Sequence, residues 1–291
     1  MAVEQGTQNS TVSLTLSPEV SDYFDTLRDR VLSLLGERRD TGHALIVTSC
    51  RSGEGVSAVA LNFALALSKT NEHGSVLLCD ANLDSPIVHK VFQVGQGPGF
   101  SDVLVGKFDL ETAIRATGIQ RLDILPAGGG DIGLSGMVDS PRMGPFLTTV
   151  KERYRVVVFD AAPVLECSAT ARLAAVSDGT ILTIEAERQR WEVAQRATDV
   201  LTDAGARILG AVLNKRRFHI PDFLYRRLLR GRKSVRAGRP VGALGASTGR
   251  WHGSCASPTR CISRTAASRR RQPYAALHVP LLGGWGGRES G

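Results

Sequence analysis

Short hydrophobic runs along the chain alternate with longer segments in which hydrophobic residues recur every three or four positions. Runs of four to six aliphatic or β-branched residues are typical of strands that are buried on both faces of a sheet. Six such runs lie at residues 44–48, 75–79, 122–125, 155–159, 180–184 and 208–213. Helices are predicted between them, near residues 56–69, 141–153, 168–177 and 190–204. Repeated strand–helix units predict an α/β fold, with a parallel sheet, right-handed crossovers and helices on both faces.

The two ends of the chain lack this alternation. Residues 1–16 are polar and are predicted to be flexible. A helix is predicted from Ser17 to about Leu35, because Ser17 suits an N-cap. Its hydrophobic face is expected to comprise Tyr23, Leu27, Val31 and Leu34. The folded domain is therefore placed at residues 17–230. Residues 231–291 have too few hydrophobic positions to offset the entropy of ordering, so we predict a disordered basic tail there.

The charge of the chain is divided unevenly between the domain and this tail. The net charge is +8, but residues 226–291 hold 14 Lys and Arg side chains and one acid, Glu289. Residues 1–225 hold 22 basic and 27 acidic side chains. A mildly acidic body disfavours binding to the phosphate backbone of a nucleic acid, so no nucleic-acid partner is expected.

Sequence features of a secreted or membrane-spanning protein are missing. A transmembrane helix needs about 18 or more apolar residues in a row, and the sequence has no such stretch. The start of the chain lacks the basic and apolar regions of a signal peptide. The five cysteines form no CxxC pair and suit a reducing compartment. We therefore expect a cytoplasmic protein.

A glycine-containing loop follows the first predicted strand and reads CRSGEGVS over residues 50–57. Glycines let backbone N–H groups turn inward and hold phosphates at the start of a helix. In a P-loop a lysine then reaches the phosphates, and a Ser or Thr binds Mg²⁺. Gly53 and Gly55 are present, Ser57 stands at the Mg²⁺ position, and Val56 stands at the lysine position. A plain strand–turn–helix junction is the alternative interpretation.

Two other predicted strands end in an acid, at Asp80 and at Asp160. Open α/β sheets bind ligands at the carboxyl ends of their strands. Together with the loop, these motifs resemble the bacterial tyrosine-kinase (BY-kinase) family over about residues 19–229. The family's loop reads close to P-G-E-G-K-S/T, and its acidic motifs read D-x-D-x-R-x-P and D-T-P-P-V. Shorter matches lie at residues 99–106, 125–128 and 209–214.

The resemblance implies a P-loop NTPase-like fold that uses ATP or ADP with Mg²⁺. It implies nucleotide contacts from Gly53, Glu54, Gly55, Val56, Ser57 and Asn214, the last as an adenine contact. It implies Mg²⁺ ligation by Ser57, Asp80 and Asp160, the two acids also acting in catalysis. A transmembrane polysaccharide co-polymerase, or chain-length determinant protein, is the implied partner, which places the chain at the inner face of the cell membrane. Homo-oligomers are a further implication.

The departures from the family pattern lie at positions that bind phosphate or Mg²⁺ in the family or that flank such positions. Val56 replaces the lysine, Asn82 and Asp84 replace the second Asp and the Arg of the first acidic motif, and Ala161 and Ala162 replace Thr and Pro. Losing a charge-assisted contact costs about 1.5–3 kcal/mol. Losing a preorganised transition-state donor costs ~10²–10³ in rate. We therefore predict weakened nucleotide binding and impaired catalysis.

Arg51, or a cation from a partner, is a candidate replacement for the missing lysine charge. The family's C-terminal tyrosine cluster is absent, because only Tyr225 and Tyr274 lie near or in the tail. The family's E-x-x-R-x-x-R helix motif, used in ring assembly, appears as Asp22-x-x-Asp25-x-x-Arg28, with the middle charge reversed.

Residues 223–230 place leucines and a tyrosine opposite three arginines. A helix there is either a membrane-surface or partner-docking helix or, as we favour for so short a segment, an ordinary last helix packed on the sheet.

Three functions are compatible with these features. The first is a BY-kinase-like pseudokinase of exopolysaccharide or capsule production with impaired catalysis, the second an active tyrosine autokinase, and the third a partition-type ATPase. The missing lysine favours the first over the second. The acidic body and the BY-kinase motifs disfavour the third.

Overall fold

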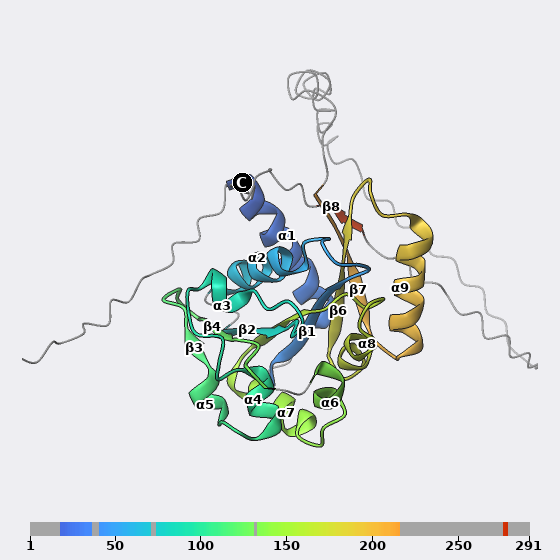
Figure 1. The fold of residues 1–291 in the computed structure, drawn as a ribbon. Coiled ribbons are helices and arrows are strands. Elements are labelled where there is room, and N and C mark those ends of the chain that lie inside the picture. The colour runs from blue at the N-terminus through green and yellow to red at the C-terminus, as the bar shows by residue number, and fades with distance from the viewer. Residues whose placement is uncertain (1–17, 37–40, 71–73, 131–132, 216–275, 279–291) are drawn as a thin grey trace, which may run out of the picture. The chain divides into compact units, whose positions relative to one another are not determined.

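The computed structural model describes residues 18–36, 41–70, 74–130, 133–215 and 276–278. Within these ranges, eight strands form one sheet in the order β3-β4-β2-β5-β1-β6-β7-β8 (Figure 1). The strands are β1 His43–Ser49, β2 Val76–Ala81, β3 Arg115–Ala116, β4 Leu122–Leu125, β5 Val156–Ala161, β6 Gly179–Glu185, β7 Ile208–Asn214 and β8 Ala276–His278. Only β3 pairs antiparallel among them. The prediction of an α/β fold with a parallel sheet is confirmed.

The helices lie on both faces of the sheet (Figure 1). The five longest are α1 Pro18–Leu35, α2 Val56–Ser68, α7 Met143–Arg153, α8 Ser168–Ala175 and α9 Trp191–Asp203, and all five lie where the sequence predicts a helix. Four short helices were not predicted: α3 Val88–Val91, α4 Phe100–Val105, α5 Leu110–Ala113 and α6 Leu134–Val138. Elements of four to six residues are too short to show a helical period.

Buried hydrophobic clusters on both faces of the sheet explain why the strands are continuously hydrophobic. In β1, Leu45 and Val47 pack in the core beneath α1 and α2. Ala44 and Ile46 alternate with them and pack in the core beneath α4, α6 and α7. All four side chains are fully buried. A strand that is covered on both faces needs apolar residues at every position, which is the pattern seen in the sequence.

The buried face of α1 differs in part from the predicted one. Leu27 and Val31 are buried as expected, together with Phe24. Tyr23 and Leu34 are instead 37% and 41% exposed. The prediction for these two residues was wrong, because the buried stripe of α1 consists of Val20, Phe24, Leu27 and Val31.

The strand β8 forms one edge of the sheet and pairs in parallel with β7, with Ala276 opposite Ala211. Its three residues lie within the segment 231–291, for which the composition predicts disorder. The other residues of that segment, together with 1–16, the expected cap at Ser17 and the expected helix at 223–230, lie outside the described residues.

Parallel strand direction brings the loops that matter for function to one edge of the sheet. The strands β1, β2, β5, β6 and β7 run in the same direction and therefore end at the same edge. The loop after β1, the acids at the ends of β2 and β5, and the residues after β7 meet there.

Candidate functional site

The loop between β1 and α2 has the backbone geometry of an anion-binding turn. Gly53 and Gly55 have φ angles of 85° and 86°, in the left-handed region that favours glycine. Gly55 is the N-cap of α2. The N–H groups of residues 53–57 have no hydrogen-bond partner in the part of the chain that the structure describes, and Val59 makes the first helical bond, 3.1 Å to the Gly55 carbonyl. Consecutive free N–H groups at a helix start form a concavity that binds anions.

Two carboxylates hold the N–H groups on the other side of this loop. The buried Glu54 accepts the N–H groups of Cys50 at 2.8 Å and Arg51 at 3.3 Å through one oxygen. The exposed Glu166, from the loop after β5, accepts the N–H and the hydroxyl of Ser52 at 3.0 and 2.6 Å. Burial raises the pKa of Glu54, while the hydrogen bonds from Arg51 and Cys50 oppose that rise. The hydrogen bonds from Ser52 lower the pKa of Glu166. Both acids brace the loop, and sequence reasoning gave this task to neither.

The position of the phosphate-binding lysine is apolar in three dimensions as well. The Val56 side chain is 9% exposed and packs in the core beneath α1 and α2. Arg51 lies on the exposed side of the loop, and its guanidinium makes no hydrogen bond or ion pair among the described residues. Its role as a replacement cation stays a prediction.

Asp80 and Asp160 are opposite each other on the neighbouring strands β2 and β5, and both are fully buried. Asp80 accepts three backbone N–H groups, from Asn82 at 3.3 Å and from Ile87 and Val88 at 3.0 Å each. Both oxygens of Asp160 lack a hydrogen-bond partner among the described residues. The two acids thus have different surroundings, one tied to the loop after β2 and the other unpaired.

The pKa values of both acids follow from this burial. Burial raises the pKa of Asp80 to about 6, against the effect of its three amide partners. Burial, and next the charge of Asp80, raise the pKa of Asp160 to about 7. The nearby Ser57 hydroxyl lowers this pKa as a hydrogen-bond donor would, although it lies outside hydrogen-bond geometry to either oxygen of Asp160. An unpaired buried carboxylate is costly unless a proton or a cation neutralises it.

The residues at this point fit a Mg²⁺ ion. The described residues contain no cluster of three or more His, Cys, Asp or Glu side chains that would enclose a metal by themselves. Mg²⁺ is usually held by one or two carboxylates, with water and phosphate oxygens completing its shell. The unpaired oxygens of Asp160, with Asp80 beside them and the Ser57 hydroxyl at the start of α2, match that requirement.

The end of β7 contacts the same loop. The buried Asn214 donates from Nδ2 to the Glu54 carbonyl at 2.9 Å, and its Oδ1 has no partner among the described residues. Lys215, the next residue, donates from Nζ to the Gly53 carbonyl. Asn214 was predicted to belong to the site, and Lys215 was missed. The only available signal was that a lysine directly follows Asn214 in the sequence.

The other departures from the family pattern lie close by. Asp84 is exposed, and Asn82 contributes its N–H to Asp80. The Ala162 carbonyl accepts hydroxyl hydrogen bonds from Thr48 at 2.8 Å and Thr170 at 3.0 Å, which tie the loop after β5 to β1 and α8.

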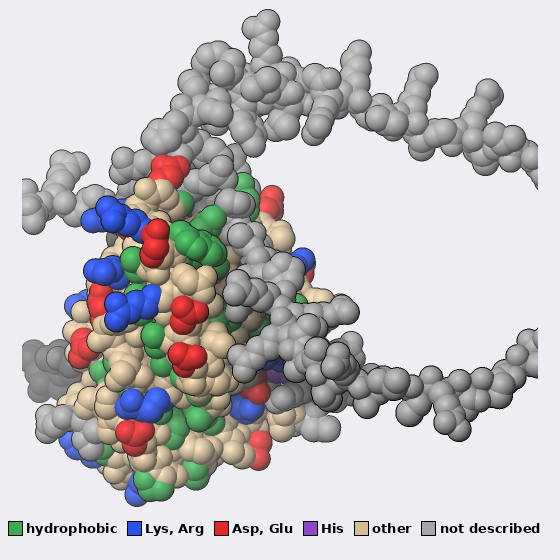
Figure 2. All heavy atoms as spheres, turned by 90° about the vertical axis from the view of Figure 1, so that its right-hand side faces the viewer, with side chains coloured by type: hydrophobic (Ala, Val, Ile, Leu, Met, Phe, Trp, Pro, Cys, Tyr) green, Lys and Arg blue, Asp and Glu red, His purple; other side chains and the backbone are tan. Residues whose placement is uncertain are grey.

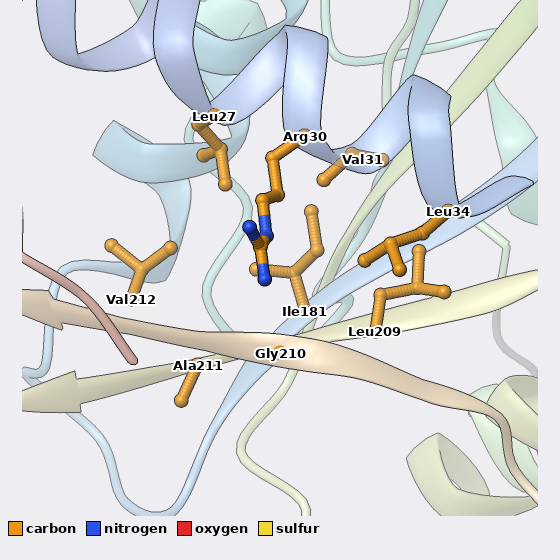
Figure 3. Close-up of a pocket in the computed structure, with 9 residues that line it drawn as sticks. All are labelled: Leu27, Arg30, Val31, Leu34, Ile181, Leu209, Gly210, Ala211 and Val212. Carbon is orange, nitrogen blue, oxygen red and sulfur yellow. The ribbon is translucent and has the colours of Figure 1, made fainter. Parts of the chain in front are cut away.

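A separate hollow lies between α1 and β7 (Figure 3). It is lined by Leu27, Arg30, Val31, Leu34, Ile181, Leu209, Gly210, Ala211 and Val212. Its volume is about 10 Å³, near the lower limit for one water molecule, and no residue of the phosphate loop lines it. It is not a candidate nucleotide site.

The face that carries α9 is mixed in charge. Basic and acidic side chains alternate across the described residues that are visible there (Figure 2). That visible surface offers no continuous basic stripe of the kind that follows a nucleic-acid backbone. No helix among the described residues is long and apolar enough to cross a bilayer.

Bacterial tyrosine kinases resemble the chain over about two thirds of its length. The tyrosine-protein kinase YwqD of Bacillus subtilis is 29% identical over 194 residues, which cover 67% of this chain and 80% of YwqD. The kinase domain of the Escherichia coli tyrosine kinase ETK has a TM-score of 0.63 at 24% identity, covers 69% of this chain and 78% of that domain, and supports the fold alone. No protein-family model matches the chain.

The kinase domain of VpsO links the chain to a family. It is 30% identical to this chain, with a TM-score of 0.60, and the similarity covers 68% of this chain and 96% of that domain. This chain belongs to the bacterial tyrosine-kinase family.

Proposed function

We propose that this chain is a BY-kinase-like protein of exopolysaccharide or capsule biosynthesis and export that binds ATP or ADP weakly and has impaired catalysis. One observation carries the proposal: the loop has free N–H groups over residues 53–57 but an apolar, buried side chain at the lysine position, Val56. The N–H groups suit a polyphosphate, whereas the cation that would neutralise its charge is missing.

Each residue of the site has a defined part in this proposal. The N–H groups that follow Gly53 hold the phosphates, and Gly55 allows the close approach of the backbone. Ser57, Asp80 and Asp160 hold Mg²⁺, which supplies positive charge against the phosphate oxygens. Support for the metal comes from the unpaired, buried oxygens of Asp160. Because kinase catalysis is mainly positioning and charge neutralisation, a site without the loop lysine retains binding better than turnover.

Calorimetric titration of the full chain with Mg²⁺-ATP and Mg²⁺-ADP tests the proposal, with a Val56→Lys variant beside the parent. We expect the variant to bind at least about tenfold more tightly, because a charge-assisted contact contributes about 1.5–3 kcal/mol. An assay of tyrosine phosphorylation on the same samples gives the second readout. Equal affinity of parent and variant, together with rapid phosphorylation by the parent, would instead establish an active autokinase.

The proposed partner is a transmembrane polysaccharide co-polymerase of the chain-length determinant class, which would bring this chain to the inner face of the membrane. Family membership supports this partner. Ring assembly through α1 has less support, because the Arg28 guanidinium is engaged within its own chain. It pairs with Asp25 at 2.8 Å and Asp29 at 2.9 Å and donates to the Ala66 carbonyl at 3.1 Å.

Membrane recruitment gives a separate test of the partner. We expect the chain to sediment with membranes when it is co-expressed with a chain-length determinant protein, and to stay in the supernatant when it is expressed alone. Immunoblotting of the two fractions measures the distribution. Equal membrane recovery with and without the co-expressed protein would contradict the proposed partner.

A further inference from the structure

Two neighbouring side chains at the end of β7 hold two consecutive carbonyl groups of the phosphate loop. Asn214 Nδ2 donates to the Glu54 carbonyl at 2.9 Å, and Lys215 Nζ donates to the Gly53 carbonyl. A Cβ atom added to Gly55 would lie 2.3 Å from Asn214 Nδ2 and 3.8 Å from Lys215 Cε. Both side chains therefore lie directly against the glycine turn.

These contacts fix the direction of the loop's N–H groups. In a planar trans peptide, the carbonyl of one residue and the N–H of the next point in opposite directions. Because the Gly53 carbonyl points to Lys215, the N–H of Glu54 points away from β7. By the same geometry, the contact with Asn214 turns the N–H of Gly55 away from β7. Neither N–H has a partner among the described residues, so both are available to an anion.

The ammonium of Lys215 has its main contact at this carbonyl. Glu185 Oε2 lies 3.7 Å from Nζ, beyond hydrogen-bond distance, and is also 3.7 Å from Arg188. A hydrogen bond from a charged donor is about twice as strong as a neutral one. In a loop whose lysine position is Val56, phosphate binding depends on the aim of the N–H groups, and a charge-assisted bond to the backbone sets that aim.

We propose that Lys215 is a positioning residue that orients the phosphate loop, compensating for the missing lysine by aiming the Glu54 N–H rather than by touching phosphate. This inference rests on the proposed nucleotide binding. It differs from the earlier candidate, Arg51, which makes no side-chain hydrogen bond or ion pair among the described residues.

Variants of the full chain at position 215 test the inference by calorimetry with two probes, Mg²⁺-ATP and Mg²⁺-tripolyphosphate. We expect Lys215→Met to bind both probes about tenfold more weakly, the loss of one charge-assisted hydrogen bond. Lys215→Arg keeps a charged donor and is expected to bind both nearly as well as the parent. Lys107→Met, at an exposed lysine outside the site, is the matched control and should leave both affinities unchanged.

The same substitution in a Val56→Lys background separates orientation from direct contact. Orientation predicts that Lys215→Met weakens binding by the same factor with either residue at position 56. If Val56→Lys abolished the effect, Lys215 would be a direct phosphate ligand, and the inference would be overturned. A loss seen with ATP but not with tripolyphosphate would also overturn it, in favour of a contact with the base.

Failure of this inference is distinguishable from failure of the proposed function. If the parent binds both probes and Lys215→Met binds them equally well, only the role of Lys215 is wrong. If the parent binds neither probe, the role of Lys215 and the proposed nucleotide binding are both wrong, because the loop then binds no phosphate. Thermal unfolding of each variant serves as the structural readout, and we expect Lys215→Met to unfold within a few degrees of the parent, because the side chain is 40% exposed.

Discussion

Replacing Asp160 with asparagine is expected to stabilise the ligand-free protein at pH 8 and to abolish Mg²⁺-dependent nucleotide binding. Burial raises the pKa of this carboxyl from 3.8 to about 7. The unfolded chain therefore ionises Asp160 near pH 4, whereas the folded chain keeps the proton until about pH 7. Between these values the folded state binds more protons, so stability falls as pH rises and stays low above pH 7. Asparagine has no charge to bury, and each pKa unit corresponds to about 1.4 kcal/mol, so a gain of a few kcal/mol is expected at pH 8.

Urea unfolding at pH 5 and pH 8 without Mg²⁺ measures this effect. We expect the variant to lose most of the difference in unfolding free energy between the two pH values. Millimolar Mg²⁺ with ADP should raise the unfolding temperature of the parent at pH 8 but not that of Asp160→Asn, since ligand binding to the native state stabilises it. If Asp160→Asn bound Mg²⁺-ADP as well as the parent did, the metal site would lie elsewhere.

Asp80→Asn is the informative comparison, because the two acids differ in their partners and not in their burial. Asp80 accepts three backbone N–H groups. In Asp80→Asn an amide NH₂ group replaces one of the two oxygens, so at least one of these backbone N–H groups faces another donor and loses its hydrogen bond. At pH 5 the folded Asp80 carboxyl is protonated, and the loss of a neutral hydrogen bond costs about 0.5–1.5 kcal/mol. We therefore expect Asp80→Asn to destabilise the protein at pH 5 and to gain less at pH 8 than Asp160→Asn, because burial raises the pKa of Asp80 less and its amide partners are lost. A loss of stability at pH 5 for Asp80→Asn but not for Asp160→Asn would show that Asp80 organises a loop while Asp160 is kept unpaired for a ligand.

The sheet could be predicted from the sequence because strands that are buried on both faces have hydrophobic residues at consecutive positions. All six runs that were continuously hydrophobic became strands. The strands β3 and β8 have two and three residues, too few to give such a signal. On α1 the spacing indicated a helix but not its orientation, since Tyr23 and Phe24 are both aromatic and only packing against α2 decides which is buried.

The candidate site residues that belong to local sequence motifs could be predicted, whereas those that act through contacts between distant parts of the chain could not. The glycines, Ser57 and the two strand-end acids follow from local motifs. Glu166 reaches Ser52 across 114 positions, and Lys215 reaches Gly53 across 162. Neither residue belongs to a local pattern that requires it. Glu54 is a middle case, because its place in the loop was predicted, but its use as a brace for Cys50 and Arg51 depends on its burial.

The two glycines of the loop are expected to differ sharply when each is replaced by alanine. Both have φ near +85°, so each substitution introduces the same left-handed strain of roughly 1–2 kcal/mol. A Cβ at Gly53 would meet no heavy atom within 4 Å, whereas at Gly55 it would lie 2.3 Å from Asn214 Nδ2. Gly53→Ala is therefore a matched control for strain, and Gly55→Ala adds a steric clash of about 1–3 kcal/mol.

We expect Gly53→Ala to retain measurable binding of Mg²⁺-ADP and Gly55→Ala to lose it. The clash at Gly55 forces Asn214 and the loop apart, so that the contact between them is lost. Urea unfolding gives the free-energy difference between the two variants, and calorimetry gives the affinities. Combining Gly55→Ala with Asn214→Ala removes the atom that clashes, so the double variant should unfold at a smaller cost than the sum of the single ones. Additive costs would mean that Asn214 does not constrain the turn. A smaller cost in stability without recovered binding would mean that Asn214 has two roles. Its side chain leaves no space for a Cβ at Gly55. It also holds the Glu54 carbonyl and thereby aims the Gly55 N–H at the phosphate.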